Sequence, residues 1–344
     1  EENKIYDQRN IYIMVYESYP NFETLQYYGY NDTSQVKYLE ENNFTIYHGA
    51  YSNGASSLSS ISRMFEINGN ISNHERYYTS GNAFGLKIFQ ANNYKIESLF
   101  ISPYFFGAYP ITWDNYYPKA NINKIGGKTL TQSIYKGEFR FNIFDNNFNY
   151  EKYLEMKNQF LISKKSKPTL FYTHNSYPGH SQNSGKCSPS EKKRFFKNLK
   201  KANIEMKNDI NTIKQNDPKS IVVLLGDHGP YLTKNCTVLR TFDVKNINKH
   251  DVQDRYGTLL AINWPDDIDS GLNELQIIQD IFPAILSNIT SNNKLFDELK
   301  VGRKFYDRFH TNIGGVNVSN GVIIGGKDHG KPMFDKRSYK INIE

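Results

Sequence analysis

Short apolar runs rich in β-forming residues alternate along this chain with helical patterns, and this alternation constrains the fold more than any other feature. The apolar runs occupy residues 11–17, 97–102, 168–174, 220–227 and 256–265. Segments between them repeat apolar residues every three or four positions, which predicts helices with one buried face at 36–42, 57–66, 190–216 and 273–286. Strands that alternate with helices favour a largely parallel sheet with helices on both faces. We therefore predict an α/β fold, an α/β/α sandwich, with a kink or break at Pro283.

The pattern changes near the C-terminus. From about Arg303 the sequence consists of short strand-like pieces and paired glycines, most clearly at 313–327. This pattern predicts a small C-terminal antiparallel sheet. We expect a main domain at residues 1–300 and a small β-rich subdomain, residues 301–344, packed on it.

Composition excludes several classes of protein. Hydrophobic residues make up 38% of the 344 residues, enough for a folded core, and no apolar run is long enough to span a membrane. The net charge is 42 − 35 = +7, which favours anionic partners such as phosphates and lipid headgroups. The most basic stretch, 191–201, has the spacing of an amphipathic helix, so we expect no nucleic-acid partner. Because the chain starts at Glu1 without methionine or a signal peptide, we expect a mature or trimmed fragment.

Polar residues stand where the predicted strands end, and ligands of open α/β sheets bind at the carboxyl ends of strands. The residues at these ends are Glu17, His174, His180, Asp227 and His228. Ser56 and Ser57 lie where a serine-rich stretch enters the predicted helix 57–66. Each residue alone has an ordinary structural explanation, such as a salt bridge, a turn, a loop histidine or a helix cap. Their combination in this order favours one polar site.

The residue types in this set are suited to metal-dependent phosphoryl chemistry. Carboxylates and imidazoles are ligands for Zn²⁺ or Mn²⁺. A divalent cation can activate a hydroxyl group and offset phosphoryl charge, and a helix N-terminus directs backbone N–H groups towards an anion. A serine at that position is a candidate nucleophile that would form a covalent intermediate.

The order of Glu17, the serine-rich helix start, the histidine loop and GDHG (226–229) resembles the alkaline phosphatase/sulfatase superfamily. The resemblance covers residues 9–290, and within the superfamily it is to phosphoethanolamine transferases and lipoteichoic-acid-synthase-type phosphoglycerol transferases. It implies a sulfatase-like catalytic domain at residues 1–300. It also implies a divalent metal, Zn or Mn with Mg as a further candidate, held by Glu17, Ser57, Asp227 and His228.

The resemblance leaves two candidates for the nucleophile. The serine-rich stretch (53–65) matched to the phosphoethanolamine-transferase pattern selects Ser57, whereas the phosphoglycerol-transferase pattern counted from its glycine selects Ser56. Both families have threonine here, so a serine is a departure. No Cys-x-Pro-Ser-Arg stretch is present, so the formylglycine nucleophile of true sulfatases is absent.

The resemblance also implies residues that bind substrate. His180, with His174 six residues earlier, stands where a histidine of the transferases contacts the substrate phosphate or a second zinc, although the local order is Pro-Gly-His instead of His-Gly-Pro. Trp113 and Asn115 lie in a segment, FGAYPITWDNYY (106–117), that resembles the substrate pocket of phosphoglycerol transferases. A tryptophan of the hydrophobic core is the structural alternative for Trp113.

The implied function is transfer of phosphoglycerol or phosphoethanolamine from a phospholipid donor to a cell-surface glycan or glycolipid, through a phosphoserine. The alternatives are a phosphodiesterase or phosphatase of the same fold and an inactive glycan- or lipid-binding ectodomain. The family works outside the cytoplasmic membrane, so we expect a periplasmic or extracellular ectodomain of a bacterial protein whose membrane anchor is absent from this chain. A disulfide between Cys187 and Cys236, which follow His180 and His228 closely, would persist there.

Overall fold

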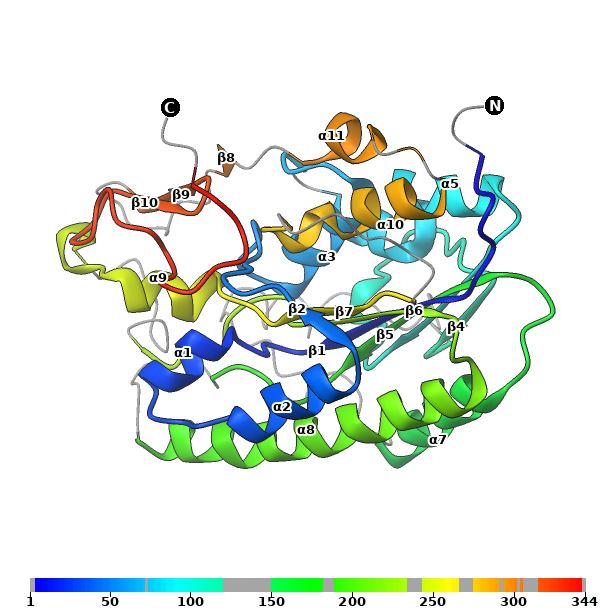
Figure 1. The fold of residues 1–344 in the computed structure, drawn as a ribbon, viewed down its shortest axis with the longest axis horizontal. Helices are drawn as coiled ribbons and strands as arrows, with labels where there is room; N and C mark the ends of the chain where they lie inside the picture. The colour runs from blue at the N-terminus through cyan, green and yellow to red at the C-terminus, as the bar shows by residue number, and fades with distance from the viewer. Residues whose placement is uncertain are drawn as a thin grey trace.

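A seven-stranded sheet forms the centre of the molecule (Figure 1). The structure, a computed structural model, describes residues 4–71, 74–119, 150–181, 189–233, 243–265, 275–290, 292, 294–301, 304–305 and 315–341. The strands lie in the order β2 (Phe44–Ile46), β7 (Leu260–Asn263), β6 (Ile221–Leu225), β1 (Ile11–Tyr16), β5 (Thr169–Asn175), β3 (Lys95–Phe100) and β4 (Asn115–Tyr117). β7 runs antiparallel to both of its neighbours, and the other pairs are parallel. The predicted, largely parallel sheet is confirmed.

The register of the central strands brings several predicted site residues to one edge. Val15 of β1 lies opposite His174 of β5 on one side and opposite Leu225 of β6 on the other. The residues that follow β1 and β6 therefore leave the sheet at the same edge, together with the end of β5. This is the arrangement that places a ligand site at the carboxyl ends of parallel strands.

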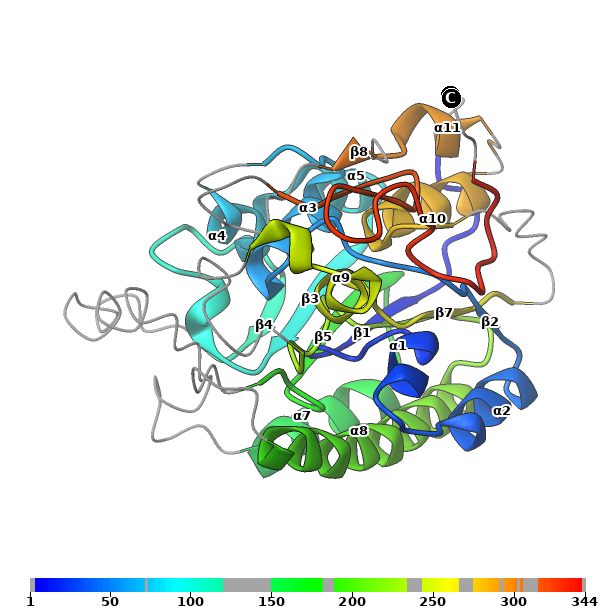
Figure 2. The same ribbon diagram turned by 90° about the vertical axis from the view of Figure 1, so that its left-hand side faces the viewer.

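Helices cover both faces of the sheet, as predicted for an α/β/α sandwich (Figures 1 and 2). One face carries α1 (Phe22–Tyr27), α2 (Thr33–Glu41), α7 (Tyr150–Ile162) and α8 (Pro189–Asn216). The other carries α3 (Ser57–Glu66), α5 (Phe84–Ala91), α10 (Ile281–Ile289) and α11 (Leu295–Leu299). Each layer has its own buried apolar cluster against the sheet, as expected when both faces of a sheet must be removed from water. Two further short α-helices among the described residues are α4 (Glu75–Tyr77) and α9 (Lys249–Tyr256).

The predicted helix at 190–216 is α8, and its basic stretch is one exposed side of an amphipathic helix. Phe195, Leu199, Ala202 and Met206 face the sheet and are buried. Of the predicted kink or break at Pro283, the break is wrong, because α10 (Ile281–Ile289) runs through this residue. Ile277 pairs with Tyr51 in an isolated bridge, so α10 begins only at Ile281. Pro283 then falls in the first helical turn, where its missing N–H costs little.

A second, small sheet lies towards the C-terminus (Figure 2). It is antiparallel, in the order β10 (Val322–Ile324), β9 (Asn317–Ser319), β8 (Lys304–Phe305), and confirms the predicted C-terminal antiparallel sheet. Its apolar residues share a buried cluster with Tyr51, Ala55 and Tyr256 of the preceding chain. The boundary at residue 300 stays a prediction.

Two further expectations concern the environment of the chain. Among the helices described, none combines the length and the apolar character that crossing a membrane requires. Cys187 and Cys236 lie outside the described residues, so the disulfide stays a prediction.

Candidate active site

Two loops that follow neighbouring strands bring Glu17, Asp227 and His228 together. The backbone N–H of Glu17 donates to the carbonyl of Asn175 at 3.0 Å, which extends the β1–β5 ladder to the edge of the sheet. Gly226 turns the chain after β6, and a Cβ at this position would lie 2.0 Å from the carbonyl oxygen of Tyr19, so the close approach requires glycine. Potential ligand atoms of Glu17, Asp227 and His228 lie within 4.8 Å of one another, and all three residues are buried.

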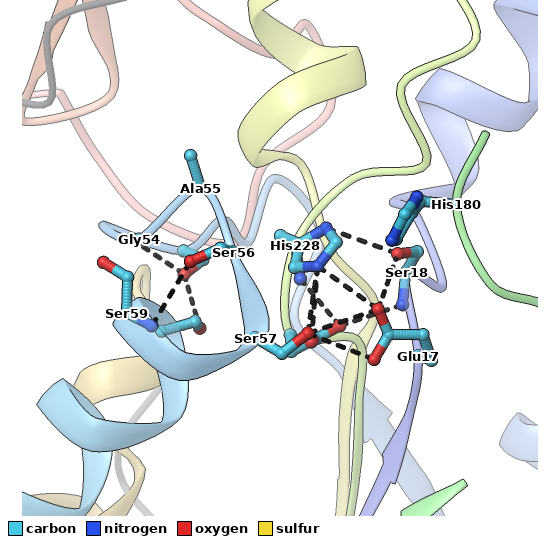
Figure 3. Close-up of polar contacts among 12 residues, drawn as sticks. Glu17, Ser18, Gly54, Ala55, Ser56, Ser57, Ser59, His180 and His228 are labelled. Atoms are coloured by element: carbon cyan, nitrogen blue, oxygen red, sulfur yellow. Dashed lines mark hydrogen bonds and ion pairs between the residues drawn. The ribbon is translucent and has the colours of Figure 1, made fainter. Parts of the chain in front are cut away.

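The start of α3 adds a hydroxyl group to this cluster. The Oγ atom of Ser57 lies 3.2 Å from both carboxylate oxygens of Glu17 and 3.3 Å from Nε2 of His228 (Figure 3). Ser56 instead caps the helix, is exposed, and accepts the backbone N–H of Ser59 at 3.4 Å. The structure therefore joins Ser57, rather than Ser56, to the polar cluster.

Buried hydrogen bonds fix the turn that precedes Ser57. Gly54 passes close to the helix start, and a Cβ there would lie 2.5 Å from the backbone nitrogen of Ser60. The hydroxyls of Ser52 and Ser60 are 2.7 Å apart, and the amide nitrogen of Gln279 donates to Ser52 Oγ at 3.2 Å. Ser52 and Ser60 therefore stabilise the turn by buried hydrogen bonds, which fixes the backbone that carries Ser57.

The donor atoms of His228 and Asp227 are oriented by backbone groups. Nδ1 of His228 lies 2.8 Å from the carbonyl of Gly229, so it carries a proton, and Nε2 is directed towards Ser57 and Glu17. The N–H of Ser18 donates to Oδ1 of Asp227 at 2.9 Å. Oδ2 of Asp227 is buried and accepts no hydrogen bond within the part of the chain that the structure describes. The Nε2 atoms of His228 and His174 lie 3.5 and 3.7 Å from it, and a buried carboxylate oxygen without a hydrogen bond fits the role of a metal ligand.

The electrostatics of the cluster also favour a bound cation. Burial alone would raise the pKa of Glu17, but hydrogen bonds with His174 and His228 outweigh it and hold the pKa well below its ordinary value. Burial opposes charge on His228, yet Asp227 and Glu17 raise its pKa. The carboxylate of Glu17 therefore stays ionised at neutral pH and attracts a cation. Two carboxylates, one imidazole nitrogen and one hydroxyl oxygen form a donor set that fits a divalent ion such as Zn²⁺ or Mn²⁺.

His174 lies beneath this cluster. Its Nε2 is 2.6 Å from Oε2 of Glu17, and its Nδ1 is 2.8 Å from the hydroxyl of Tyr172. The side chain is completely buried, and Phe105 packs on its ring at 4.7 Å. His174 was expected to contact substrate, and that role stays a prediction. The contacts in the structure are those of a residue that orients Glu17.

His180 lies beside His228 (Figure 3). The two imidazole rings are 5.9 Å apart, and burial lowers the pKa of His180. Its loop is anchored to the site by two backbone bonds, from Gly179 N–H to the carbonyl of Glu17 and from Ser181 N–H to the carbonyl of Pro230. His180 is therefore a partly buried histidine beside the cluster, and its expected contact with substrate stays a prediction.

Trp113 and Asn115 lie apart from these contacts. Trp113 is buried, packs on Phe65 and Tyr172, and donates its indole N–H to the carbonyl of Thr79 at 2.9 Å. Asn115 is exposed at the first position of the edge strand β4. Among the described residues, neither forms a hydrogen bond with the polar cluster, and their proposed substrate contacts stay predictions.

Two residues at the site were not anticipated from sequence, Ser18 and Tyr231. Both have left-handed backbone conformations, with φ of 57° and 60°, which residues other than glycine rarely adopt. Ser18 directly follows the predicted metal ligand Glu17, and Tyr231 lies three residues after the predicted ligand His228. Their proximity in sequence to Glu17 and His228 is the available signal, but nothing in a single sequence reports a positive φ.

Comparison with known proteins identifies the fold. No protein-family model and no curated protein matches the sequence. Solved structures do match. The integral membrane lipooligosaccharide phosphoethanolamine transferase A (EptA) from Neisseria meningitidis has a TM-score of 0.55 at 14% identity, covering 86% of this chain and 57% of that protein.

Two further structures extend the comparison. The zinc complex of the C-terminal periplasmic domain of EptC from Escherichia coli has a TM-score of 0.51 at 12% identity, with 80% of each chain covered. The lipoteichoic acid synthase LtaP from Listeria monocytogenes has a TM-score of 0.53 at 12% identity, covering 94% of this chain and 82% of that one. At such identities the similarity shows the fold alone, and it is the alkaline-phosphatase-like fold that the sequence resemblance implied.

Proposed function

We propose that this chain is the catalytic domain of a metal-dependent phosphotransferase. It moves a phosphoglycerol or phosphoethanolamine group from a phospholipid donor to a cell-surface glycan or glycolipid. The observation that carries the proposal is the position of Ser57. Its hydroxyl lies at the N-terminus of α3 and within 3.3 Å of both Glu17 and His228, beside a buried carboxylate oxygen of Asp227 that has no hydrogen-bond partner among the described residues.

Glu17, Ser57, Asp227 and His228 would hold the metal, and Zn²⁺ and Mn²⁺ both suit the donor set. The bound cation would lower the pKa of the serine hydroxyl and offset negative charge on the phosphoryl oxygens. Ser57 is the first residue of α3, and the positive end of the helix dipole would favour an anion there. The zinc in the related EptC structure supports a divalent metal here.

Ser57 would act as the nucleophile of a two-step transfer. In the first step its Oγ forms a bond to phosphorus, the P–O bond to diacylglycerol breaks, and the serine proton ends on the released diacylglycerol hydroxyl. In the second step a glycan hydroxyl forms the new O–P bond, the Ser57–phosphorus bond breaks, and Ser57 regains a proton. His180, partly buried beside His228, is proposed to bind the phosphoryl oxygens during both steps.

The location of the reaction follows from the proposed donor. A phospholipid donor and a surface acceptor require a site outside the cytoplasmic membrane, so we place this chain in a membrane-anchored bacterial protein. The related EptC structure is described as a periplasmic domain and the related EptA as an integral membrane protein, which supports this placement.

Intact-protein mass spectrometry tests the proposal. The zinc-loaded protein is incubated separately with phosphatidylglycerol and phosphatidylethanolamine, alongside the variants Ser57→Ala and Ser56→Ala. We expect a mass gain of one phosphoglycerol or one phosphoethanolamine unit in wild type and Ser56→Ala, and none in Ser57→Ala. An adduct that persists in Ser57→Ala would contradict the assignment of the nucleophile.

The same assay separates the alternatives. An adduct that is discharged by water as fast as by added glycan indicates a hydrolase of the same fold. A protein that binds metal but forms no adduct with either lipid contradicts the proposed donor class. A protein that neither binds metal nor cleaves a model phosphodiester is a binding domain.

A further inference from the structure

Tyr231 touches the predicted metal ligand His228 through its ring. The two rings are stacked, with centroids 5.0 Å apart and planes 9° from parallel. His180 contacts the same tyrosine ring at 5.5 Å, and the guanidinium of Arg255 lies 4.0 Å from the ring centroid. The side chain of Tyr231 is only 6% exposed. The ring is therefore held between groups on several sides and restricts the position of the imidazole of His228.

The hydroxyl of Tyr231 reaches a different part of the site. It donates a hydrogen bond to the backbone carbonyl of Ala55, two residues before Ser57. Figure 3 shows Ala55 in the turn that leads into α3, with Ser57 facing His228. One side chain thus connects the loop after β6 with the turn that carries the proposed nucleophile, across 176 residues of sequence.

The backbone of Tyr231 supports a functional interpretation of these contacts. Its φ of 60° lies in the left-handed region, which glycine adopts without strain and aromatic residues rarely adopt. Strained residues of this kind persist where surrounding contacts over-determine them, and they cluster at functional sites. Here the neighbouring backbone is anchored as well, because the carbonyl of Pro230 accepts the N–H of Ser181 at 2.8 Å.

We propose that Tyr231 is a positioning residue that sets the distance between the Ser57 hydroxyl and the donor atoms of Glu17 and His228. This inference rests on the proposed function and assigns to it a residue that does not itself touch the reacting atoms. The ring fixes His228, and the hydroxyl fixes the turn at Ala55. Loss of the hydroxyl alone would let the Ser57 turn shift while His228 keeps its packing, and displacement of a reacting group by about 1 Å can cost on the order of 100-fold in rate.

The variant Tyr231→Phe separates the two contacts, because it keeps the ring and removes the hydroxyl. Tyr94→Phe is the matched control: Tyr94 is also buried and donates to a backbone carbonyl, that of Arg9 at 3.0 Å, away from the site. For Tyr231→Phe we expect the rate of adduct formation at saturating lipid to fall by about 10-fold or more with KM and zinc affinity little changed. Tyr94→Phe should match wild type in adduct rate, KM and zinc affinity. An adduct rate for Tyr231→Phe equal to that of Tyr94→Phe would overturn the inference.

A second readout does not depend on the lipid donor. Amide hydrogen exchange of the peptide that contains Ser56, Ser57 and Leu58 should be faster in zinc-loaded Tyr231→Phe than in zinc-loaded wild type or Tyr94→Phe, because the turn loses its anchor. Unchanged exchange would overturn the inference even if no adduct forms. Conversely, failure of wild type to form an adduct, with faster exchange in Tyr231→Phe, would contradict the proposed function and leave the positioning role supported.

Discussion

The carboxylate of Glu17 is held by a chain of buried hydrogen bonds. Tyr172 contacts Nδ1 of His174 at 2.8 Å, and Nε2 of His174 contacts Glu17 at 2.6 Å. All three side chains are almost inaccessible to solvent. Partners of this kind fix the orientation and basicity of a ligating group, and their loss weakens metal binding without removing a ligand.

The variant His174→Leu tests this relay at similar side-chain volume. We expect its zinc affinity to fall by about 10- to 100-fold, because Glu17 loses its strongest hydrogen bond. Tyr172→Phe removes only the hydrogen bond between Tyr172 and His174, so its zinc affinity should fall less. Competition with a chromophoric chelator measures the zinc affinity of each variant, and thermal melting verifies that each variant is folded. Wild-type zinc affinity in folded His174→Leu would show that the relay does not support the metal.

The candidate site was partly predictable at the level of single residues. Glu17, Asp227 and His228 follow apolar runs, and strand ends are where an α/β sheet places its ligands. The structure brings them together with Ser57. Ser18 and Tyr231 were not found, because their contribution depends on a left-handed backbone that a single sequence does not reveal.

A buried lysine joins two helices to the sheet. Nζ of Lys157 in α7 donates to Asn175 of β5 at 2.9 Å and to Glu205 and Asp209 of α8 at 2.6 and 2.7 Å. Tyr16 of β1 donates to Asp209 at 2.7 Å. Because Asn175 also accepts the backbone N–H of Glu17, this network lies directly behind the site.

Removing the lysine should leave the buried carboxylate of Asp209 and the partly buried carboxylate of Glu205 without their cation. For Lys157→Met we expect a loss of about 3–5 kcal/mol in the free energy of unfolding. Lys37→Met is the control, because Lys37 forms an exposed pair with Glu41 and should change stability by less than about 0.5 kcal/mol. Urea denaturation measures both. A loss in Lys157→Met no larger than in the control would contradict the assigned role.

The same variant should be more destabilised at higher pH. Burial raises the pKa of Asp209 to about 6 although Lys157 opposes the shift, so Asp209 favours the folded state below its unfolded pKa of about 4 and loses that contribution as the pH rises through 6. Without Lys157 the pKa of Asp209 should rise further. The stability difference between wild type and Lys157→Met should therefore be larger at pH 8 than at pH 5, and the reverse trend would contradict this explanation.

Helices and strands were predictable where the pattern was strong. The apolar residues of the long α8 and of the strands β1, β5 and β6 are the residues that the fold buries. Their spacing in the sequence therefore predicts these elements correctly. The three-residue edge strand β4 has too few residues to give a pattern. The start of α10 was misplaced because Ile277, in a long-range bridge with Tyr51, has an extended backbone, and a 3-10 helix (Ile278–Asp280) lies between it and α10.

At the scale of the whole molecule, the C-terminal segment shares a buried cluster with the turn before Ser57. Val318, Met333 and Phe334 belong to the same cluster as Tyr51 and Ala55. Lys249 of α9 adds an ion pair with Asp335 at 2.6 Å. The small antiparallel sheet was predictable from its glycine-rich strand pattern, but its packing near the site depends on contacts distant in sequence.

This packing predicts cooperative unfolding. Phe334 is completely buried, so Phe334→Ala should lower the free energy of unfolding by about 3–5 kcal/mol. Because the cluster is shared, we expect one unfolding transition in both wild type and variant, followed by circular dichroism and tryptophan fluorescence. Two separate transitions in wild type would show that residues 301–344 unfold independently of residues 1–300.

Zinc binding decides whether Glu17, Ser57, Asp227 and His228 form a metal centre. Metal-free protein is titrated with Zn²⁺ by calorimetry, for wild type, Asp227→Asn and the exposed-serine control Ser56→Ala. We expect tight binding of one zinc ion per chain in wild type and Ser56→Ala, and affinity weaker by about 100-fold or more in Asp227→Asn. Absence of tight binding in wild type, or equal affinity in Asp227→Asn, would contradict the metal-dependent site on which the proposed transfer depends.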